Sequence, residues 1–217
     1  MKRRMRIAAA SLLAAGLTGC SGLQNSSFET LNLAISGLDP TITVADVNAL
    51  KGPALLVRFG QADALMVAST VQGNYVQWRG VGEHLVTDHG RLVRSAGLPT
   101  DILAPLLPDD PFILGLHNVT DGLEISRQLD YPARYQTGLR QIARYQRGAL
   151  ESVEIMGQAR ELQRIDERIE IPALGFKAQN RYWVDPQTGL ILDSVQYLTP
   201  ELPPLRLTLV RPYGGQP

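Results

Sequence analysis

Short runs rich in β-branched and aromatic residues, separated by turn-forming pairs that contain glycine, fill most of the chain from residue 52 onward. Within these runs apolar and polar residues alternate, and a period of two places successive side chains on opposite faces of a β-strand. The turns between the runs suit tight connections between antiparallel neighbours. The pattern predicts strands at 54–59, 64–71, 74–79, 83–87, 91–95, 123–129, 135–147, 150–156, 174–184, 190–197 and 205–211.

Three stretches between these runs are less regular. Residues 98–107 predict a helical turn, and the Pro- and Asp-rich residues 108–111 predict a loop. Residues 158–171 are ambiguous, because their leucine and isoleucines fit helical spacing as well as one face of a strand. We favour a strand there, since long predicted strands flank it. A chain with many strands and a few short helices predicts an all-β fold in which curled antiparallel sheets form open half-barrels.

The first residues predict the cellular compartment. Residues 1–19 combine a basic start with an apolar stretch that is too short to span a bilayer permanently, which is typical of a secretory signal peptide. The tetrad Leu17-Thr18-Gly19-Cys20 follows, and it resembles the lipobox of bacterial lipoprotein precursors. An ordinary secretory signal followed by a coincidental cysteine is the weaker interpretation, because Cys20 is the only cysteine of the chain.

We therefore expect Cys20 to be the acylated first residue of the mature protein. Residues 20–26 would form a lipidated tether, and residues 27–217 a single β-rich periplasmic domain. One acyl chain binds a membrane only marginally, whereas two or more give a stable anchor. Ser21 stands where lipoproteins retained at the inner membrane carry Asp, so resemblance to that sorting rule implies the periplasmic face of the outer membrane.

Charge and residue content exclude several classes of function. Without the cations of the signal peptide the chain is mildly acidic and has no basic stripe, so nucleic acid is not an expected partner. A single cysteine allows no disulfide and no thiolate metal site. His84, His89 and His117 lack metal-ligand spacing, and no phosphate loop or dinucleotide fingerprint is present, so we expect no metal and no cofactor.

Two capping-box signals predict short helices before the first strand. Thr43-x-x-Asp46 would begin a helix near residues 44–50. Ser26-x-x-Glu29 would begin an earlier helix, whose apolar face consists of Phe28, Leu31, Ile35 and Leu38.

Two longer stretches of the sequence are distinctive. The first is DHGRLVRSAGLPTDIL at residues 88–103, preceded by Trp78, and the second is NRYWVDPQTG at residues 180–189, continuing to Ser194-Val195-Gln196. Together with the lipobox and the two short helices predicted before the first strand, they resemble the YjbF/GfcB family of exopolysaccharide and group-four capsule lipoproteins over most of the mature chain. At His89-Gly90 that family usually has Asn-Gly or a similar turn, a difference that a turn tolerates.

The resemblance implies an accessory lipoprotein encoded with machinery that makes or exports a surface polysaccharide. It also implies half-barrels of antiparallel strands, and it assigns no catalytic residue. The second stretch is similar, more loosely, to the open β half-barrels of lipoprotein-carrier proteins.

Few residues fit a catalytic role. Asp109 and Asp110 are the best carboxylate pair, but glycan cleavage needs two carboxyl groups on converging elements, ~5–9 Å apart. Adjacent residues in a Pro-flanked loop do not converge, so we interpret them as a solvated acidic loop. Ser69, Ser95 and Ser194 lack the Gly-x-Ser-x-Gly elbow of serine hydrolases. We therefore expect that the protein is not an enzyme.

Aromatic residues supply the remaining candidate contacts. Along a strand Tyr75 and Trp78 would face opposite ways, as would Tyr182 and Trp183, so one member of each pair is expected in the core. An exposed Trp183 beside Arg181 is a candidate contact for a partner protein or a glycan.

Two functions from different classes follow from these observations. The first is a non-enzymatic accessory factor in exopolysaccharide or capsule production or export, with a core filled by its own side chains and with polysaccharide-export proteins or a glycan as partners. The alternative is a half-barrel carrier or receptor, whose unfilled apolar concave face would bind a lipid or lipid-linked glycan. A glycan-cleaving enzyme is a third, weaker hypothesis.

Overall fold

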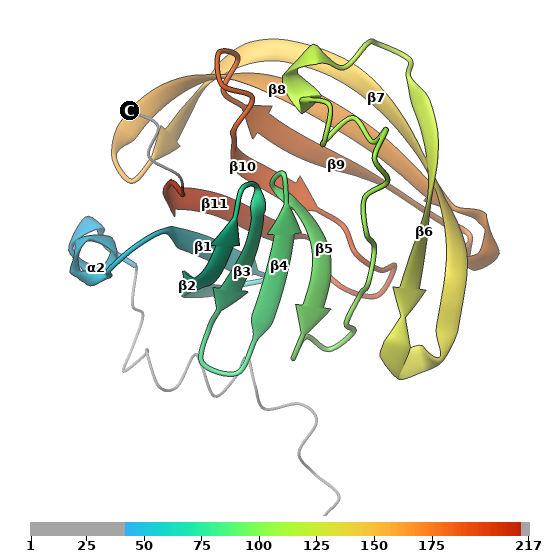
Figure 1. The fold of residues 1–217 in the computed structure, drawn as a ribbon, viewed down its shortest axis with the longest axis horizontal. Coiled ribbons are helices and arrows are strands. Elements are labelled where there is room, and N and C mark those ends of the chain that lie inside the picture. Colours follow the sequence, from blue (N-terminus) through green and yellow to red (C-terminus); the bar gives the residue numbers. More distant parts are fainter. Residues whose placement is uncertain (1–41, 214–217) are drawn as a thin grey trace, which may run out of the picture.

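The computed structural model describes residues 42–213, which form one curled antiparallel sheet of eleven strands (Figure 1). Its elements are α2 (Val44–Ala49), β1 (Ala54–Phe59), β2 (Ala62–Gln72), β3 (Tyr75–Arg79), β4 (His84–Asp88), β5 (Arg91–Ala96), the 3-10 turn η1 (Leu116–Asn118), β6 (Glu124–Tyr131), η2 (Pro132–Arg134), β7 (Gln136–Ile155), β8 (Gln158–Ile171), η3 (Pro172–Leu174), β9 (Phe176–Val184), β10 (Ile191–Gln196) and β11 (Leu205–Arg211).

The order of strands across the sheet is β5-β4-β3-β2-β1-β11-β10-β9-β8-β7-β6. It consists of two meanders, β1 to β5 and β6 to β11, which join where the first strand pairs with the last. The sheet curls so that β5 and β6, its two edge strands, approach each other across the front of the view in Figure 1. The predicted all-β half-barrel is confirmed, and all its strands belong to a single sheet.

The two edges of the sheet are bridged by an extended segment of the β5–β6 connection. Leu103 exchanges backbone hydrogen bonds with Asp130 of β6 at 3.0 and 2.8 Å, while Ala104 donates to Val93 of β5 at 2.8 Å. The helical turn predicted for residues 98–107 is therefore wrong. Alternate residues of the segment are buried with a period of two, and free backbone groups on both sheet edges favour an extended chain over a helix.

β7 and β8 are the longest strands and form one continuous hairpin. Residues 158–171 are a strand, as we favoured, because they pair with β7 from Gln158 to Glu170. The predicted break after Arg147 is instead a β-bulge between Arg147 and Leu150, which bends β7 without ending it. In Figure 1 this hairpin arches over the top of the molecule and ends at the upper left.

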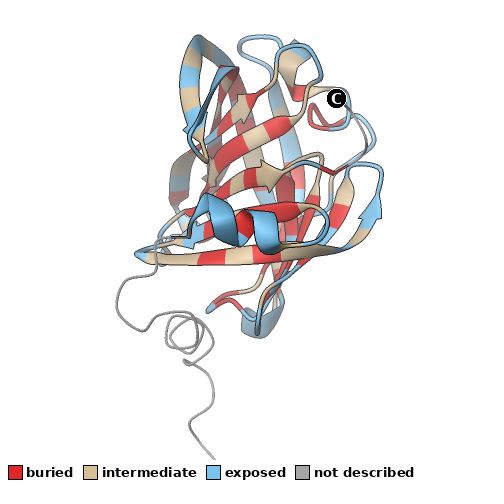
Figure 2. Ribbon diagram, turned by 90° about the vertical axis from the view of Figure 1, so that its left-hand side faces the viewer, coloured by how far each residue is buried: buried red, intermediate tan, exposed pale blue. Residues whose placement is uncertain are grey.

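Alternate residues of each strand face the concave side and form the core. Along β11, for example, Leu205, Leu207 and Leu209 are buried and the residues between them are partly exposed. Figure 2 shows the same alternation of buried and exposed residues on neighbouring strands. Trp78 and Tyr182 are the buried members of the two aromatic pairs, which confirms that one of each pair lies in the core.

Helix α2 begins as predicted. The Asp46 N–H donates to Thr43 Oγ1 at 3.3 Å and the Asp46 carboxylate accepts from the Thr43 N–H at 2.7 Å, which completes the capping box. The predicted signal peptide, the Cys20 anchor, the tether and the helix that would carry Phe28 lie outside the described residues and stay predictions.

Candidate functional site

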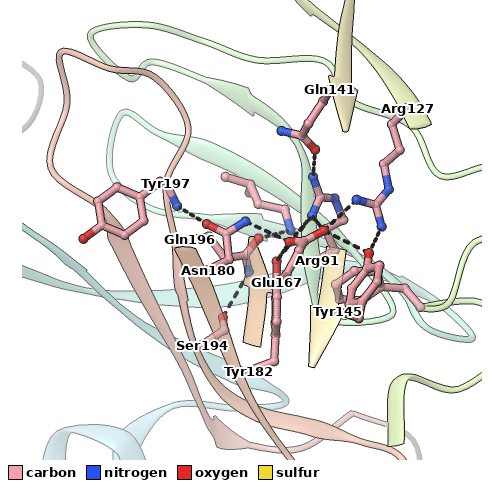
Figure 3. Close-up of polar contacts among 12 residues, drawn as sticks. Arg91, Arg127, Gln141, Tyr145, Glu167, Asn180, Tyr182, Ser194, Gln196 and Tyr197 are labelled. Carbon is pink, nitrogen blue, oxygen red and sulfur yellow. Dashed lines mark hydrogen bonds and ion pairs between the residues drawn. The ribbon is translucent and has the colours of Figure 1, made fainter. Parts of the chain in front are cut away.

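The concave side of the sheet encloses buried charged residues centred on Glu167 of β8 (Figure 3). Glu167 has no exposed surface, and its carboxylate accepts from Arg91 Nη1 of β5 at 2.9 and 3.1 Å. Arg127 of β6 donates through Nη1 to the same carboxylate at 2.6 Å. The site thus links one edge strand, the other edge strand and the middle of the longest hairpin.

Three neutral side chains complete the hydrogen bonds of Glu167. The hydroxyl groups of Tyr145 and Tyr182 donate to its two oxygens, each at 2.9 Å, and Asn180 Nδ2 donates at 2.8 Å. Tyr145 also accepts a hydrogen bond from Arg127. Because a carboxylate has about four lone-pair sites, these donors leave Glu167 no capacity for a further ligand.

Asp110 supplies a second buried carboxylate. Arg127 donates to it through both Nε and Nη2, and the Phe112 N–H donates to its Oδ1 at 3.1 Å. The guanidinium carbons of both arginines lie over the Phe112 ring, each 5.5 Å from its centroid. Stacked cations of this kind lose less on burial than isolated ones, since the ring face attracts positive charge.

The buried charges balance one another. Arg91 and Arg127 oppose Glu167 and Asp110, so the cluster as a whole is neutral. Burial alone would raise the pKa of Glu167, but the two arginines outweigh it and hold that pKa well below its ordinary value. Burial, helped by the Glu167 charge, raises the pKa values of Tyr145 and Tyr182 well above 10, so both stay protonated donors.

A second set of polar contacts joins β5 to β10 beside this cluster. Gln196 accepts from the Leu92 N–H at 2.9 Å and donates to the Gly90 carbonyl at 3.1 Å and to Ser194 at 3.0 Å. Asn180 accepts from the Tyr197 N–H at 2.7 Å, which connects this set to the Glu167 cluster. Both sets appear in Figure 3.

The cavities beside the buried polar and aromatic side chains are small. The cavity beside Arg91, Gln141 and Asn180 measures about 20 Å³, and one lined by Trp78 and Tyr213 is of the same size. Each is about the size of one water molecule. Around the Glu167 cluster, side chains of residues 42–213 therefore fill the concave side of the half-barrel, and a larger opening lies at one end.

Sequence analysis missed this polar cluster, because its members come from many strands and none forms a local motif. Two signals were available. Glu167 is a charged residue on the inward face of β8, where its two neighbours on that face, Ile165 and Ile169, are apolar. The two stretches that carry the family resemblance also contribute to the cluster; their members are Arg91, Asn180, Tyr182, Ser194 and Gln196.

One open end of the half-barrel holds a larger cleft of about 820 Å³. Its walls include α2, the loop before η1, the turn before β10 and the tip of the β7–β8 hairpin. Apolar side chains such as Leu114 and Met156 line it together with polar ones such as His117 and Arg160. Mixed chemistry of this kind suits an amphipathic ligand better than a purely apolar one.

The predicted contact residues Arg181 and Trp183 share the outer face of β9, since Asn180 and Tyr182 face inward. The Trp183 indole N–H donates to Glu151 Oε2 at 2.7 Å, and the Arg206 guanidinium lies 6.0 Å from the ring centroid. The Arg181 side chain is 54 % exposed, with its Nε 3.7 Å from Asp166. Trp183 is thus partly buried and held in place, while Arg181 reaches into solvent.

The remaining candidates are dispersed. Asp109 is exposed, as expected for a solvated loop, but that interpretation is wrong for Asp110, because the loop turns its carboxylate inward to meet Arg127. His84, His89 and His117 lie on β4, the β4–β5 turn and η1. Ser69 and Ser194 form hydrogen bonds with Gln77 and Gln196, which are not bases. Ser95 donates to Asp101, whose carboxylate also accepts from the Gly97 and Leu98 N–H groups and so closes a turn.

Among residues 42–213, no group of three or more histidine, cysteine or acidic side chains is placed to hold a metal ion. Within the same range, no helix has the length and apolar character needed to cross a membrane.

Fold and site together define a class of protein, a single-sheet β half-barrel whose concave side is closed by its own charge-balanced polar cluster. Comparison with known proteins narrows this class. The family described as group 4 capsule polysaccharide lipoprotein gfcB, YjbF matches residues 28–210, and the chain belongs to that family.

Two similar proteins come from Escherichia coli K12. The uncharacterized lipoprotein GfcB is 23% identical over 213 residues, covering 96% of this chain and 99% of the relative. The crystal structure of the hypothetical lipoprotein YmcC has a TM-score of 0.67 and 19% identity, covering 81% of this chain and all of the other. The predicted family resemblance and half-barrel fold are therefore confirmed.

Proposed function

We propose that this protein is an outer-membrane-anchored, non-enzymatic accessory factor in the production or export of a capsule or exopolysaccharide. Membership of a family of capsule polysaccharide lipoproteins supports the pathway. The single observation that favours an accessory role is the filled interior, where Glu167 and its partners occupy the position that a carrier would leave for its ligand. Acylated Cys20 would hold the domain at the periplasmic face of the outer membrane.

Deletion and complementation test this proposal. Loss of the gene should abolish or strongly reduce the surface polysaccharide, and the wild-type chain should restore it. The Cys20→Ala variant should be soluble and should restore it poorly, because an unanchored domain loses its local concentration at the membrane. Unchanged polysaccharide in the deletion strain would contradict the proposed role, and an intact mass without acyl groups on Cys20 would contradict the anchor.

We further propose Arg181 and Trp183 as a contact for an export protein or a glycan. A partly buried tryptophan fixed by Glu151, beside an exposed arginine, offers a rigid apolar surface next to a charge. Arg181→Ala should reduce export while leaving the melting temperature unchanged, since its ion pair with Asp166 is long and exposed. Arg168→Ala, which removes another exposed arginine from β8, is the matched control.

The end cleft favours one alternative, binding of a lipid or lipid-linked glycan. Its volume of about 820 Å³ falls within the ~300–1,000 Å³ typical of small-molecule sites. If the cleft serves this purpose, delipidated protein should bind a fluorescent fatty acid, and Leu114→Glu in the cleft wall should weaken that binding. Absence of saturable binding would leave the accessory role as the better account.

A further inference from the structure

The β7–β8 hairpin extends beyond the strands that flank it. β6 pairs with β7 only as far as Arg144, and two backbone hydrogen bonds continue the pairing to Tyr145, whose carbonyl accepts from the Gly122 N–H and whose N–H donates to the Leu123 carbonyl. The Arg147 N–H then donates to the Asp121 side chain at 2.6 Å. Beyond that point, residues 150–155 pair with β8 alone among the described residues. We call these residues the arm edge.

The turn at the tip shows which backbone groups of the arm edge are free. Ile155 and Gln158 pair across the two-residue turn Met156-Gly157, whose φ angles of +50° and +78° correspond to a type I′ turn. The residues that flank such a turn bond to each other, and alternate residues bond outward. The N–H and C=O groups of Leu150, Ser152 and Glu154 therefore point away from β8.

Proteins usually protect a free strand edge, because it is a template for another strand. The arm edge carries no lysine or proline, and its two charged residues are Glu151, which is already paired, and Glu154. The carbonyls at the bulge, by contrast, are occupied, since Gln163 Nε2 donates to Gly148 at 2.8 Å. The unpaired groups thus begin where the bulge ends and continue to the turn.

The side chains on the arm edge define the chemistry of a strand that would fit it. Leu150, Ser152 and Glu154 share one exposed face, and the Leu150 side chain is 59% exposed. Glu151 on the other face is already paired with Arg164 and Trp183, whereas Glu154 has no ion pair among the described residues. A complementary strand would place an apolar residue beside Leu150 and a cation beside Glu154.

A second copy of the chain fits this edge poorly. An isologous pair of arm edges would run antiparallel about a twofold axis. Every register centred on a residue from Glu151 to Glu154 brings Glu151 or Glu154 directly opposite or diagonal to its own copy. Like charges in those positions destabilise paired strands. The edge therefore favours a different polypeptide with a basic residue.

We propose that the arm edge binds an extended segment of a partner protein by β-augmentation, with a Lys or Arg of the partner facing Glu154 and an apolar residue facing Leu150. The three pairs of outward backbone groups supply affinity, and the two side chains supply specificity. The proposal rests on the proposed function only in taking that partner to belong to the export machinery.

The test uses the chain without its signal peptide and with Cys20→Ala. The probe is a fluorescein-labelled synthetic peptide of alternating Thr and Val. One Lys in the peptide, four residues from a Val on the same face, would meet Glu154 while that Val meets Leu150. Saturable binding is expected by fluorescence anisotropy. Ser152→Pro removes an outward N–H without removing a bond to β8, and should weaken binding about tenfold or more. Ser152→Ala, the matched control, should bind like the parent.

Charge reversal provides a test that does not depend on proline. Glu154→Lys should weaken binding of the Lys peptide about threefold and improve binding of the same peptide with Glu in place of Lys. Absence of saturable binding, or equal binding by a fully folded Ser152→Pro variant, would overturn the proposal.

Two other occupants would also overturn it. A dimer, measured by light scattering and converted to monomer by Ser152→Pro, would identify a second copy. Peptide binding that appears only when residues 21–41 are removed would assign the edge to the chain's own amino-terminal segment. Because peptide binding is measured on the purified protein, failure of the export role in cells would leave this result unaffected.

Discussion

Replacing Glu167 with Gln removes the carboxylate on which the interior polar cluster is centred and changes little else in shape. In the wild-type protein that carboxylate accepts from two arginines, two tyrosines and one asparagine. The amide keeps one acceptor and turns an NH₂ group toward donors. It also leaves the cluster with Arg91, Arg127 and a single carboxylate, Asp110, and so with one uncompensated positive charge.

The expected loss is large. Removing one partner of a buried ion pair typically costs about 3–5 kcal/mol, because the remaining charge is left without compensation. A domain of this kind has a total free energy of unfolding of about 5–15 kcal/mol. Urea titration followed by tryptophan fluorescence should therefore show a much lower midpoint for Glu167→Gln, with an unchanged slope if the denatured state is unaffected.

A double-mutant cycle separates charge from packing. Arg91→Met alone leaves the cluster with one excess negative charge, whereas Arg91→Met combined with Glu167→Gln restores neutrality. The double variant should thus be more stable than the sum of the two single losses predicts, by about 2 kcal/mol or more. Additive losses, or a loss below about 1 kcal/mol for Glu167→Gln, would refute the view that charge balance holds the interior together.

Three other perturbations test the same interior and the sheet edges around it. The pKa of Glu167 is lower in the folded state than its ordinary 4.5, so its contribution to stability is complete above that pH and decreases as the pH falls below it. The raised pKa of Tyr182 makes stability decrease above about pH 10. Thermal melts across pH should show both limits, and Glu167→Gln should weaken the loss of stability at acid pH. Leu103→Pro removes the N–H that bonds to Asp130, so it should lower the free energy of unfolding by about 3 kcal/mol and speed hydrogen exchange at the Asp130 amide. Leu103→Ala, the control at this partly exposed position, should lower it by less than about 1 kcal/mol. Gly90→Ala should cost about 2–4 kcal/mol in a chemical melt, because φ is +79° and the new Cβ would lie 2.7 Å from an isoleucine side chain of β10; a loss below about 1 kcal/mol would contradict that packing.

Much of the sheet follows from local sequence. The strands at 54–59 and 205–211 have the predicted bounds, because their alternation meets a core on one face and solvent on the other. The capping box at Thr43 was equally readable, since both of its partners lie within one turn of helix. In each case the information that fixes the structure is contained in a few adjacent residues.

The features that were missed depend on partners distant in sequence. Residues 98–107 are extended because both sheet edges offer them hydrogen bonds, and no local pattern reveals that the edges meet there. Asp110 is buried because Arg127 comes from another strand, so its Pro-flanked neighbourhood gave the wrong interpretation. The cluster around Glu167 likewise assembles only when the sheet curls, and a charged residue at an inward-facing position of β8 does not by itself reveal the partners that it meets.

Two of the proposed contacts, the arm edge and the Arg181–Trp183 pair, lie on the outside of the half-barrel and are physically joined. Glu151 lies within the arm edge, and its carboxylate accepts from the Trp183 indole at 2.7 Å and pairs with Arg164. Trp183 in turn stands two residues from Arg181 on the outer face of β9. A strand that bound the arm edge would restrain Glu151 and therefore the ring that it holds. The β7–β8 hairpin thus carries both Glu167, inside the molecule, and Glu151, which connects the arm edge to Trp183 on the outer face. A partner bound at the arm edge would therefore restrain the Trp183 contact without any ligand entering the interior.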